Sequence, residues 1–309
     1  MEAIVYRSTG SWYDLRTPVG EAWKARIKGV FKIEGLRSTN PIAVGDVVDF
    51  DVDNELEKTG IITHIHDRRN YISRQSPSHR KQHHIVASNI DQSLLVATIR
   101  EPRTSSGFLD RFLVAAEAYH VPAIIVVNKM DNWKDKDRAV FAEWQHTYEA
   151  IGYKVLAISA QSGDGLQAVQ QALQHKTTLL SGHSGVGKSS LLNTLVPDWN
   201  LRTGDVSGWS GKGMHTTTFA EMFDLPFGGR VVDTPGIREF GIVDVPREEL
   251  SHYFPEMRQL LEHCQFNNCL HMNEPGCAVK AALEAGSISP ERYFSYLNIL
   301  DSIPENHWE

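Results

Sequence analysis

The chain has 309 residues, a formal net charge of −7 and a hydrophobic content of 41%, enough for more than one domain with its own core. No apolar run approaches the roughly 20 residues of a membrane-spanning helix, and residues 1–10 lack the order of a signal peptide. These features argue against a membrane-spanning helix and a signal peptide. We therefore expect a cytoplasmic protein without a membrane partner, and nothing in the sequence demands more than a monomer.

Short alternating segments separated by glycine turns fill the first seventy residues. Regular short strands with such turns predict a small β-barrel, and an oligonucleotide-binding (OB-fold-like) barrel over residues 1–70 is the leading candidate. The predicted strands are Glu2–Tyr6, Trp12–Leu15, Ala22–Ile33, Asp46–Val52 and Thr59–Ile65.

Aromatic and basic residues alternate in this barrel and offer stacking surfaces and phosphate partners for RNA. An ordinary barrel core with solvated lysines is the alternative. The aromatic residues are Trp12, Tyr13, Trp23 and Phe31, and the basic ones are Arg7, Arg16, Lys24, Arg26, Lys28 and Lys32.

A basic stretch follows at residues 68–84, which contain no acidic residue. A basic linker is expected over residues 71–90. In a chain of net charge −7, the local excess favours contact with a polyanion, although a merely soluble linker is the other interpretation. Its basic residues and histidines are Arg68, Arg69, Arg74, His79, Arg80, Lys81, His83 and His84.

The next motif follows a β-branched run at Val121–Val127, typical of a central parallel strand buried on both faces. At its carboxyl end stand Asn128, Lys129, Met130 and Asp131, the Asn-Lys-x-Asp pattern. The Asp131 carboxylate can accept hydrogen bonds from the guanine ring N–H and amine, a donor pair that adenine lacks. A solvated turn is the alternative. A further strand, Lys154–Ser159, ends in Ser159 and Ala160, which match a loop that supports guanine.

A phosphate-binding loop matches G-x-x-x-x-G-K-[S/T] without deviation. It follows residues 176–181, whose central residues Thr177 to Leu180 suit a buried strand, and it precedes the helix start at residues 190–196. This is the strand–loop–helix context that the motif requires; the alternative is a glycine-rich turn before a core helix. We expect Lys188 to reach the β- and γ-phosphates and Ser189 to bind Mg²⁺. The nucleotide-binding residues predicted here are Gly182, His183, Ser184, Gly185, Val186, Gly187, Lys188, Ser189 and Ser190.

Two segments are predicted to sense the γ-phosphate. Residues 203–218 have the composition of a loop that orders when a threonine meets Mg²⁺, with Thr217 favoured and Thr216 next; a threonine-rich edge strand is the alternative. Asp233 and Gly236 belong to an Asp-Thr-Pro-Gly loop, in which the carboxylate holds the Mg²⁺ shell and the glycine N–H faces the phosphate. Ile237 follows, where many GTPases carry a water-orienting glutamine, so slow intrinsic hydrolysis and completion of the site by a partner are expected.

All three cysteines fall within residues 264–277, together with one histidine. Three thiolates and one imidazole form a closed tetrahedral Zn²⁺ set, which predicts one structural zinc ion; unbound cysteines in a helical tail are the alternative. Helices are expected at residues 278–286 and 290–303. The predicted ligands are Cys264, Cys269, His271 and Cys277.

The guanine motif precedes the phosphate loop, whereas an ordinary GTPase has the reverse order. The chain therefore reads as a multidomain protein with a central α/β, circularly permuted P-loop GTPase at residues 91–243 and a mainly α zinc-binding domain at residues 244–309. An ATPase, a GTP-dependent enzyme acting on another RNA such as tRNA, and a nucleotide-gated RNA-binding scaffold are the alternatives.

Together with the barrel, these motifs resemble the RsgA (YjeQ) family of GTPases dependent on the small ribosomal subunit, over essentially the whole chain. The resemblance implies a GTPase that binds the small subunit and its rRNA late in maturation, hydrolyses GTP to GDP and phosphate when bound, and then leaves. Some members carry a catalytic histidine beyond the Asp-x-Pro-Gly loop. Ile242–Leu250 contains none, so no catalytic histidine is assigned.

Overall fold

The computed structural model describes residues 1–27, 41–75, 83–197, 220–233 and 245–304. Phe31, Lys28, Lys32, His79, Arg80, Lys81, Thr216, Thr217, Gly236 and Ile237 lie outside this set. The strands are β1 (Glu2–Ser8), β2 (Tyr13–Arg16), β3 (Ala22–Ile27), β4 (Val47–Asn54), β5 (Thr59–Ile65), β6 (Tyr71–Gln75), β7 (His83–Ser88), β8 (Gln92–Ala97), β9 (Ala123–Val127), β10 (Lys154–Ala157), β11 (Thr177–Ser181), β12 (Glu221–Asp224) and β13 (Arg230–Asp233). The helices are α1 (Ser106–Ala118), α2 (Asp135–Ala150), α3 (Leu166–Leu173), α4 (Lys188–Leu195), α5 (Pro255–Arg258), α6 (Ala278–Glu284) and α7 (Pro290–Ser302), with short 3-10 helices at Met130–Asn132, Arg247–Tyr253 and Leu261–His263.

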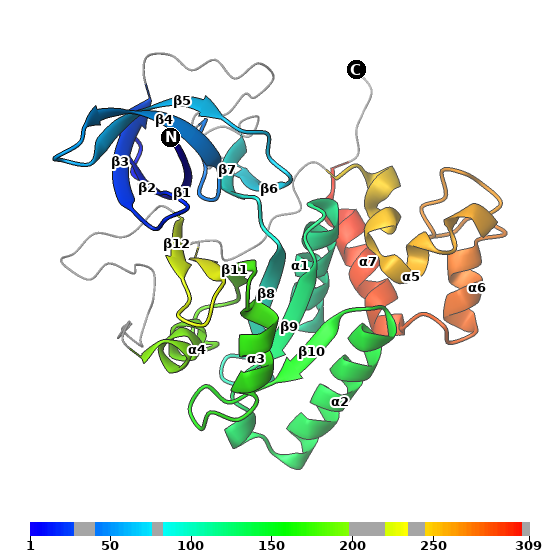
Figure 1. The fold of residues 1–309 in the computed structure, drawn as a ribbon. Coiled ribbons are helices and arrows are strands. Elements are labelled where there is room, and N and C mark those ends of the chain that lie inside the picture. The colour runs from blue at the N-terminus through cyan, green and yellow to red at the C-terminus, as the bar shows by residue number, and fades with distance from the viewer. Residues whose placement is uncertain (28–40, 76–82, 198–219, 234–244, 305–309) are drawn as a thin grey trace.

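The five N-terminal strands close into a barrel, as predicted (Figure 1). Their order is β1-β2-β3-β5-β4, and β4 pairs back to β1. Strands β3 and β5 are parallel, while the other pairs are antiparallel. Alternate residues of each strand point inward to one apolar core, as the period of a strand requires. This arrangement is that of a five-stranded OB-fold-like barrel.

Two aromatic residues proposed as RNA stacking surfaces belong to the barrel core. Tyr13 and Trp23 are each 2% exposed, so for them the ordinary-core interpretation holds. The Trp23 ring packs against Phe50 at 5.3 Å between ring centroids. Trp12 is 38% exposed, and the Arg26 guanidinium lies 5.9 Å from its ring centroid. Of these aromatic residues, only Trp12 is therefore available for stacking within the described part of the chain.

The central sheet has the order β10-β9-β8-β11-β13-β12, parallel except for β12. Its strands bury both faces. In β8, Leu95 and Ala97 face a core shared with α1 and α2, whereas Leu94 and Val96 face a core shared with α3 and α4. The result is the three-layer α/β/α domain expected from the strand–loop–helix motifs.

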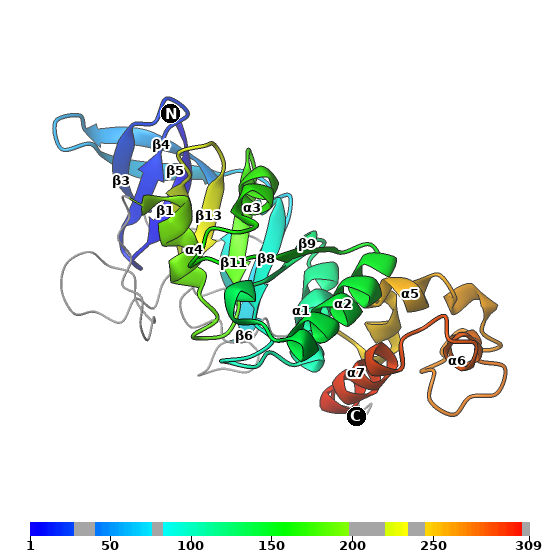
Figure 2. The same cartoon turned by 90° about the horizontal axis from the view of Figure 1, so that it is seen from below.

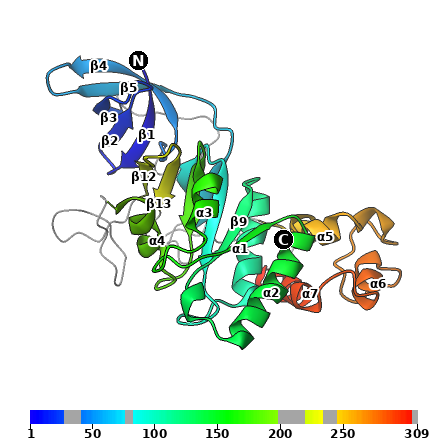
Figure 3. The same ribbon diagram turned by 60° about the horizontal axis from the view of Figure 1, so that its bottom comes forward.

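The barrel and the central sheet share one continuous sheet of eleven strands. Strand β1 pairs antiparallel with β12 at Arg7 and Glu221. Beside this pair, the Tyr6 hydroxyl donates to Asp224 at 2.6 Å, and Arg230 donates to the Tyr6 oxygen at 3.0 Å. The views in Figures 2 and 3 likewise place the barrel against the β12–β13 hairpin, at the end opposite the C-terminal helices.

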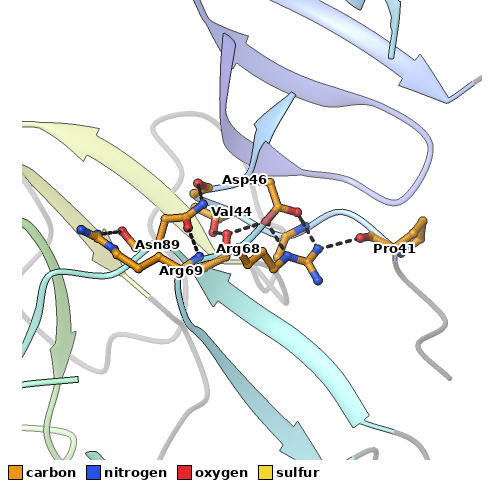
Figure 4. A network of polar contacts seen from close by, with 9 residues as sticks. Pro41, Val44, Asp46, Arg68, Arg69 and Asn89 are labelled. Carbon is orange, nitrogen blue, oxygen red and sulfur yellow. Dashed lines mark hydrogen bonds and ion pairs between the residues drawn. The ribbon is translucent and has the colours of Figure 1, made fainter. Parts of the chain in front are cut away.

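Residues 71–90, expected as a basic linker, contain the antiparallel pair β6–β7. Arg68, expected to contact a polyanion, is 9% exposed in its side chain and forms a two-pronged ion pair with Asp46 at 2.7 and 2.6 Å (Figure 4). Ser88 donates to the same carboxylate at 2.6 Å. Arg69 binds Asp91 at 2.7 Å. Both arginines are therefore engaged within the protein, and the Asp46 carboxylate joins Arg68 to Ser88 at the end of β7.

The C-terminal domain packs on α1 through a buried ionic cluster. The Arg292 guanidinium on α7 lies 2.7 Å from Asp110 of α1 and 2.8 Å from Glu256 of α5. Tyr148 of α2 also donates to Asp110, at 2.8 Å. Burial raises the pKa of Asp110, and the Arg292 charge opposes that rise. Since this cluster joins α5 and α7 to α1 and α2, it fixes the C-terminal domain against the central domain.

Candidate active site and metal cluster

The predicted nucleotide loops converge at the carboxyl edge of the central sheet. Strands β8 and β11 are neighbours, but the chain leaves β8 toward β9 and leaves β11 toward β13. Adjacent parallel strands whose connections run in opposite directions form the switch point at which such sheets bind ligands. The phosphate loop, residues 182–189, begins directly after β11 and leads into α4. The loop therefore lies between a strand and a helix, as the phosphate-binding motif requires.

Two glycines of the phosphate loop fit only because they lack a side chain. A Cβ on Gly182 would lie 2.3 Å from the Val96 carbonyl oxygen, and one on Gly187 would lie 2.4 Å from the Asn128 side-chain nitrogen. Their φ angles of +141° and +95° are also unfavourable for other residues. The loop can therefore approach both β8 and the Asn-Lys-x-Asp segment closely.

Lys188 is half-buried beside the loop that it is predicted to serve. Its ammonium group donates to the carbonyl oxygens of Gly182 and His183 at 2.6 and 2.9 Å. Burial lowers the pKa of Lys188, and the Asp233 charge opposes that shift. A bound phosphate would add the negative charge that this buried cation favours.

Ser189 and Ser190, in the first turn of α4, are half-buried, and Val186 is buried against the sheet. Ser184 and Gly185 are exposed at the loop tip. The His183 ring stacks on Phe108 of α1 at 3.6 Å between centroids. Both ends of the loop are thereby anchored, and its tip is exposed to solvent.

Asn128 connects three loops of the site. Its side-chain amide donates to the Val186 carbonyl of the phosphate loop at 2.9 Å. Its side-chain oxygen accepts from the backbone N–H groups of Lys129 at 2.8 Å and Ala160 at 3.0 Å. Asn128 is 2% exposed, so water cannot replace these partners readily. Asn128 thus holds the phosphate loop and the predicted guanine-binding segment next to each other.

Asp131 is exposed and oriented by its neighbour. The Ser159 hydroxyl donates to one oxygen of Asp131 at 2.6 Å, and Ser159 itself is fully buried. Met130 donates its backbone N–H to the Ile158 carbonyl at 3.0 Å. Lys129 adopts a left-handed backbone conformation with a φ of 69°, and its ammonium group donates to the Glu101 carbonyl. One carboxylate oxygen of Asp131 is thereby fixed at the mouth of the site, as base recognition requires.

Asp233 stands at the end of β13 in one row of residues that crosses the sheet. It pairs with Leu180 of β11 on one side and with Glu221 of β12 on the other. Burial raises the pKa of Glu221, Arg7 opposes the rise, and Asp14 and Asp233 add to it. Asp233 and Ser189 present hard oxygen donors from neighbouring segments, which fits the ligands that Mg²⁺ prefers. Thr217 and Gly236 lie outside the described residues, so their roles stay predictions.

The four predicted zinc ligands form one compact cluster. Their ligand atoms all lie within 4.8 Å of one another. The His271 Nδ1 atom lies 3.7 Å from the Cys264 sulfur and 3.4 Å from the Cys277 sulfur. A tetrahedral Zn²⁺ with ordinary bond lengths requires about 3.6 Å between such atoms. The geometry and the donor set therefore both fit zinc.

The surroundings prepare this cluster for a cation. Burial lowers the pKa of His271, which keeps its imidazole neutral and able to donate a lone pair. Burial raises the pKa of the Cys269 thiol to about 12, and a bound cation would favour its thiolate form. Tyr293 and Tyr296 donate to the carbonyl oxygens of His271 and Leu270 at 2.6 and 2.8 Å. Helix α7 thus holds the backbone of the ligand loop.

Comparison with known proteins identifies the family. A protein-family model described as RsgA GTPase matches residues 65–243, and one described as RsgA N-terminal domain matches residues 2–62. The chain belongs to the RsgA GTPase family. It is accordingly a GTP hydrolase, and the resemblance and multidomain fold predicted from the sequence are confirmed.

Members of the RsgA family match along almost the whole chain. A protein of Flavobacterium psychrophilum named small ribosomal subunit biogenesis GTPase RsgA is 51% identical, covering 99% of this chain and 94% of its own length. A protein of the same name from Bacteroides fragilis is 46% identical over 100% and 99% of the two chains. YjeQ from Thermotoga maritima is 33% identical with a TM-score of 0.79, covering 97% of each chain. YloQ, titled a circularly permuted GTPase, is 31% identical with a TM-score of 0.76, over 98% and 96% of the chains.

Sequence reasoning missed several contacts that shape this RsgA-family site. Neither the His183–Phe108 stack nor the Arg7–Glu221 pair belongs to a motif. No short-range signal could have found them, because each joins residues from separate segments. Among the described residues, no helix is both long enough and apolar enough to cross a membrane.

Proposed function

We propose that this chain hydrolyses GTP to GDP and phosphate during biogenesis of the small ribosomal subunit. The observation that carries the proposal is the meeting of the phosphate loop, the Asn-Lys-x-Asp segment and the Ser159–Ala160 loop at Asn128. Family membership supplies the hydrolase activity, and the names of the relatives supply the process.

Within the site, Asp131 reads the guanine ring through the carboxylate that Ser159 orients. Asn128, Lys129, Met130, Ser159 and Ala160 frame the base, and Gly182 to Ser190 surround the phosphates through backbone N–H groups. Lys188 neutralises the β- and γ-phosphates as they gain charge in the transition state.

Ser189 and Thr217 would hold Mg²⁺, Asp233 would support its shell, and the Gly236 N–H is the predicted donor to the γ-phosphate. When bound, Mg²⁺ supplies positive charge that favours phosphoryl transfer to water. Cys264, Cys269, His271 and Cys277 hold one zinc ion in a closed set that leaves no position for catalysis.

The proposed partner is the small ribosomal subunit, with contacts to its rRNA. Support comes from the printed names of the relatives and from the OB-fold-like barrel, an architecture that binds oligonucleotides in other proteins. We infer a cytoplasmic monomer with domains at residues 1–70, 91–243 and 244–309. Size-exclusion chromatography with light scattering tests the monomer.

Ile237 offers no polar atom that could position the attacking water. The subunit is therefore proposed to complete the site. Phosphate release should be measured for the purified protein alone, with small subunits and with large subunits. Strong stimulation by small subunits only is the expected result. Equal stimulation by both subunits, or fast hydrolysis without either, would contradict the proposal.

A further inference from the structure

Four charged groups follow one another from the barrel to the phosphate loop, three of them in one row of the sheet and the fourth at the start of α4. Arg7 of β1 pairs with Glu221 of β12, and Glu221 pairs with Asp233 of β13. Asp233 in turn acts electrostatically on Lys188. The order of charges is positive, negative, negative and positive. The barrel is thus one strand away from the carboxylate at the magnesium side of the site.

The central two charges of this row repel each other. Residues directly opposite in an antiparallel pair point to the same face with Cβ atoms about 5 Å apart, and like charges there are unfavourable. Glu221 retains 24% exposure in its side chain, so solvent screens it only in part. A nearby cation must therefore compensate each carboxylate, and Arg7 does so for Glu221 at 3.8 Å.

Arg7 is a cation whose position depends on the barrel. Its guanidinium is 41% exposed and is shared between Glu221 and Asp14, which lies 3.7 Å away on β2. Both contacts are long for ion pairs, so a competing anion can draw the guanidinium away at little cost. A shift of the barrel against β12 would have the same effect. Either event leaves Glu221 uncompensated opposite Asp233.

We propose that Arg7 and Glu221 are positioning residues through which the barrel sets the Mg²⁺ affinity of the nucleotide site. With Arg7 in place, the two residues add no net charge beside Asp233. When the Arg7 guanidinium moves away, the negative charge of Glu221 remains beside Asp233, and Mg²⁺ binds more tightly. This inference rests on the proposed place of Asp233 in the Mg²⁺ shell, and its link to the ribosome rests on the proposed function.

The test is an equilibrium binding measurement on the full-length protein. A fluorescent GDP analogue is titrated at a series of Mg²⁺ concentrations, and the Mg²⁺ concentration for half-maximal tight binding is recorded. Glu221→Gln removes a negative charge and should raise this concentration about threefold to tenfold. Arg7→Gln removes a positive charge and should lower it about twofold to fivefold. The double variant should return close to the wild-type value, because its net charge in the row is unchanged.

Matched controls separate charge from structure. Arg7→Lys keeps the charge and should restore the wild-type value. Arg16→Gln breaks the other ion pair between barrel and β12, with Asp224 at 3.6 Å, but at the end of the hairpin away from Asp233. It should shift the Mg²⁺ requirement by less than about twofold. Equal shifts for Arg7→Gln and Arg16→Gln, or shifts of the same sign for Arg7→Gln and Glu221→Gln, would overturn the inference.

A second arm adds small ribosomal subunits to the same titration. Subunits should lower the Mg²⁺ requirement of the wild-type protein and leave that of Arg7→Gln unchanged. Subunits that shift both proteins equally would count against Arg7 as the link. Subunits that neither bind nor stimulate would count against the proposed function, whereas the measurements on the isolated protein would still decide the role of Arg7 and Glu221.

Discussion

Replacing Asn128 by alanine should destabilise the nucleotide site more than the small loss of side-chain volume implies. The substitution removes three hydrogen bonds, to Val186, Lys129 and Ala160, from a residue that is 2% exposed. Two of the lost partners belong to other loops. The change therefore disconnects the phosphate loop and the Ser159–Ala160 loop from the Asn-Lys-x-Asp segment at one point.

The magnitude follows from the groups left without partners. A buried backbone group that loses its partner costs about 1–3 kcal/mol, and the Lys129 N–H is near enough to solvent to recover part of its loss. We expect the free energy of unfolding to fall by about 2–4 kcal/mol. If half of this cost falls on loop alignment, nucleotide affinity drops about fivefold to thirtyfold, because each tenfold step corresponds to about 1.4 kcal/mol.

Isothermal titration with GDP and with a non-hydrolysable GTP analogue measures the affinities, and urea unfolding measures the stability. Both nucleotides should weaken equally, because Asn128 aligns loops and does not distinguish a γ-phosphate. Asn128→Asp is the control: it keeps the acceptor for Lys129 and Ala160 but places an oxygen against the Val186 carbonyl, so it should still bind poorly. Affinities within about twofold of wild type for the alanine variant would refute this account.

Three further predictions concern base choice, the metal and the joint between domains. Asp131→Asn should shift the binding preference from guanine to xanthine nucleotides, because an amide N–H can donate to the xanthine 2-oxo group. Competition binding measures this preference, and an unchanged preference would exclude Asp131 as the residue that recognises the base. Chelation should release one zinc ion per chain and make three thiols reactive toward a thiol reagent, while GDP binding persists. Thiols that react before chelation would argue against a bound zinc ion. Arg292→Met should lower the free energy of unfolding by about 3–5 kcal/mol, since it leaves Asp110 and Glu256 buried without their cation. Arg258→Met, which removes an exposed ion pair with Glu117, should cost at most about 1 kcal/mol, and equal losses for the two variants would contradict the cluster's role.

Short-range patterns were enough to predict the elements that carry the site. The apolar run Val121–Val127 contains β9, and residues 176–181 contain β11. Their motif loops meet because the carboxyl ends of parallel strands share one edge of a sheet. The spacing of the cysteines and His271 likewise predicted a cluster that the structure brings together. Residue type and local order determine these features.

Contacts between distant segments could not be predicted in this way. Tyr13 and Trp23 are residue types that can stack on bases, but the alternation of their strands points both side chains into the barrel core. Arg68 belongs to a basic run, yet it pairs with Asp46 from another turn of the barrel. The partner of a charged residue depends on which strands become neighbours, and that choice is made by the packing of the whole chain.

The pairing of β1 with β12 has a consequence for how the chain acquires its structure during synthesis. The Tyr6–Asp224 hydrogen bond joins residues that are 218 positions apart. At ordinary translation rates, the ribosome needs about 10 to 40 s to make that intervening length. Strands β2 and β4 can enclose β1 early, but its third neighbour emerges only after the phosphate loop has been made. A nascent barrel would therefore complete its last pairing when most of the central domain already exists, so the seam forms as a late, joint step of both domains.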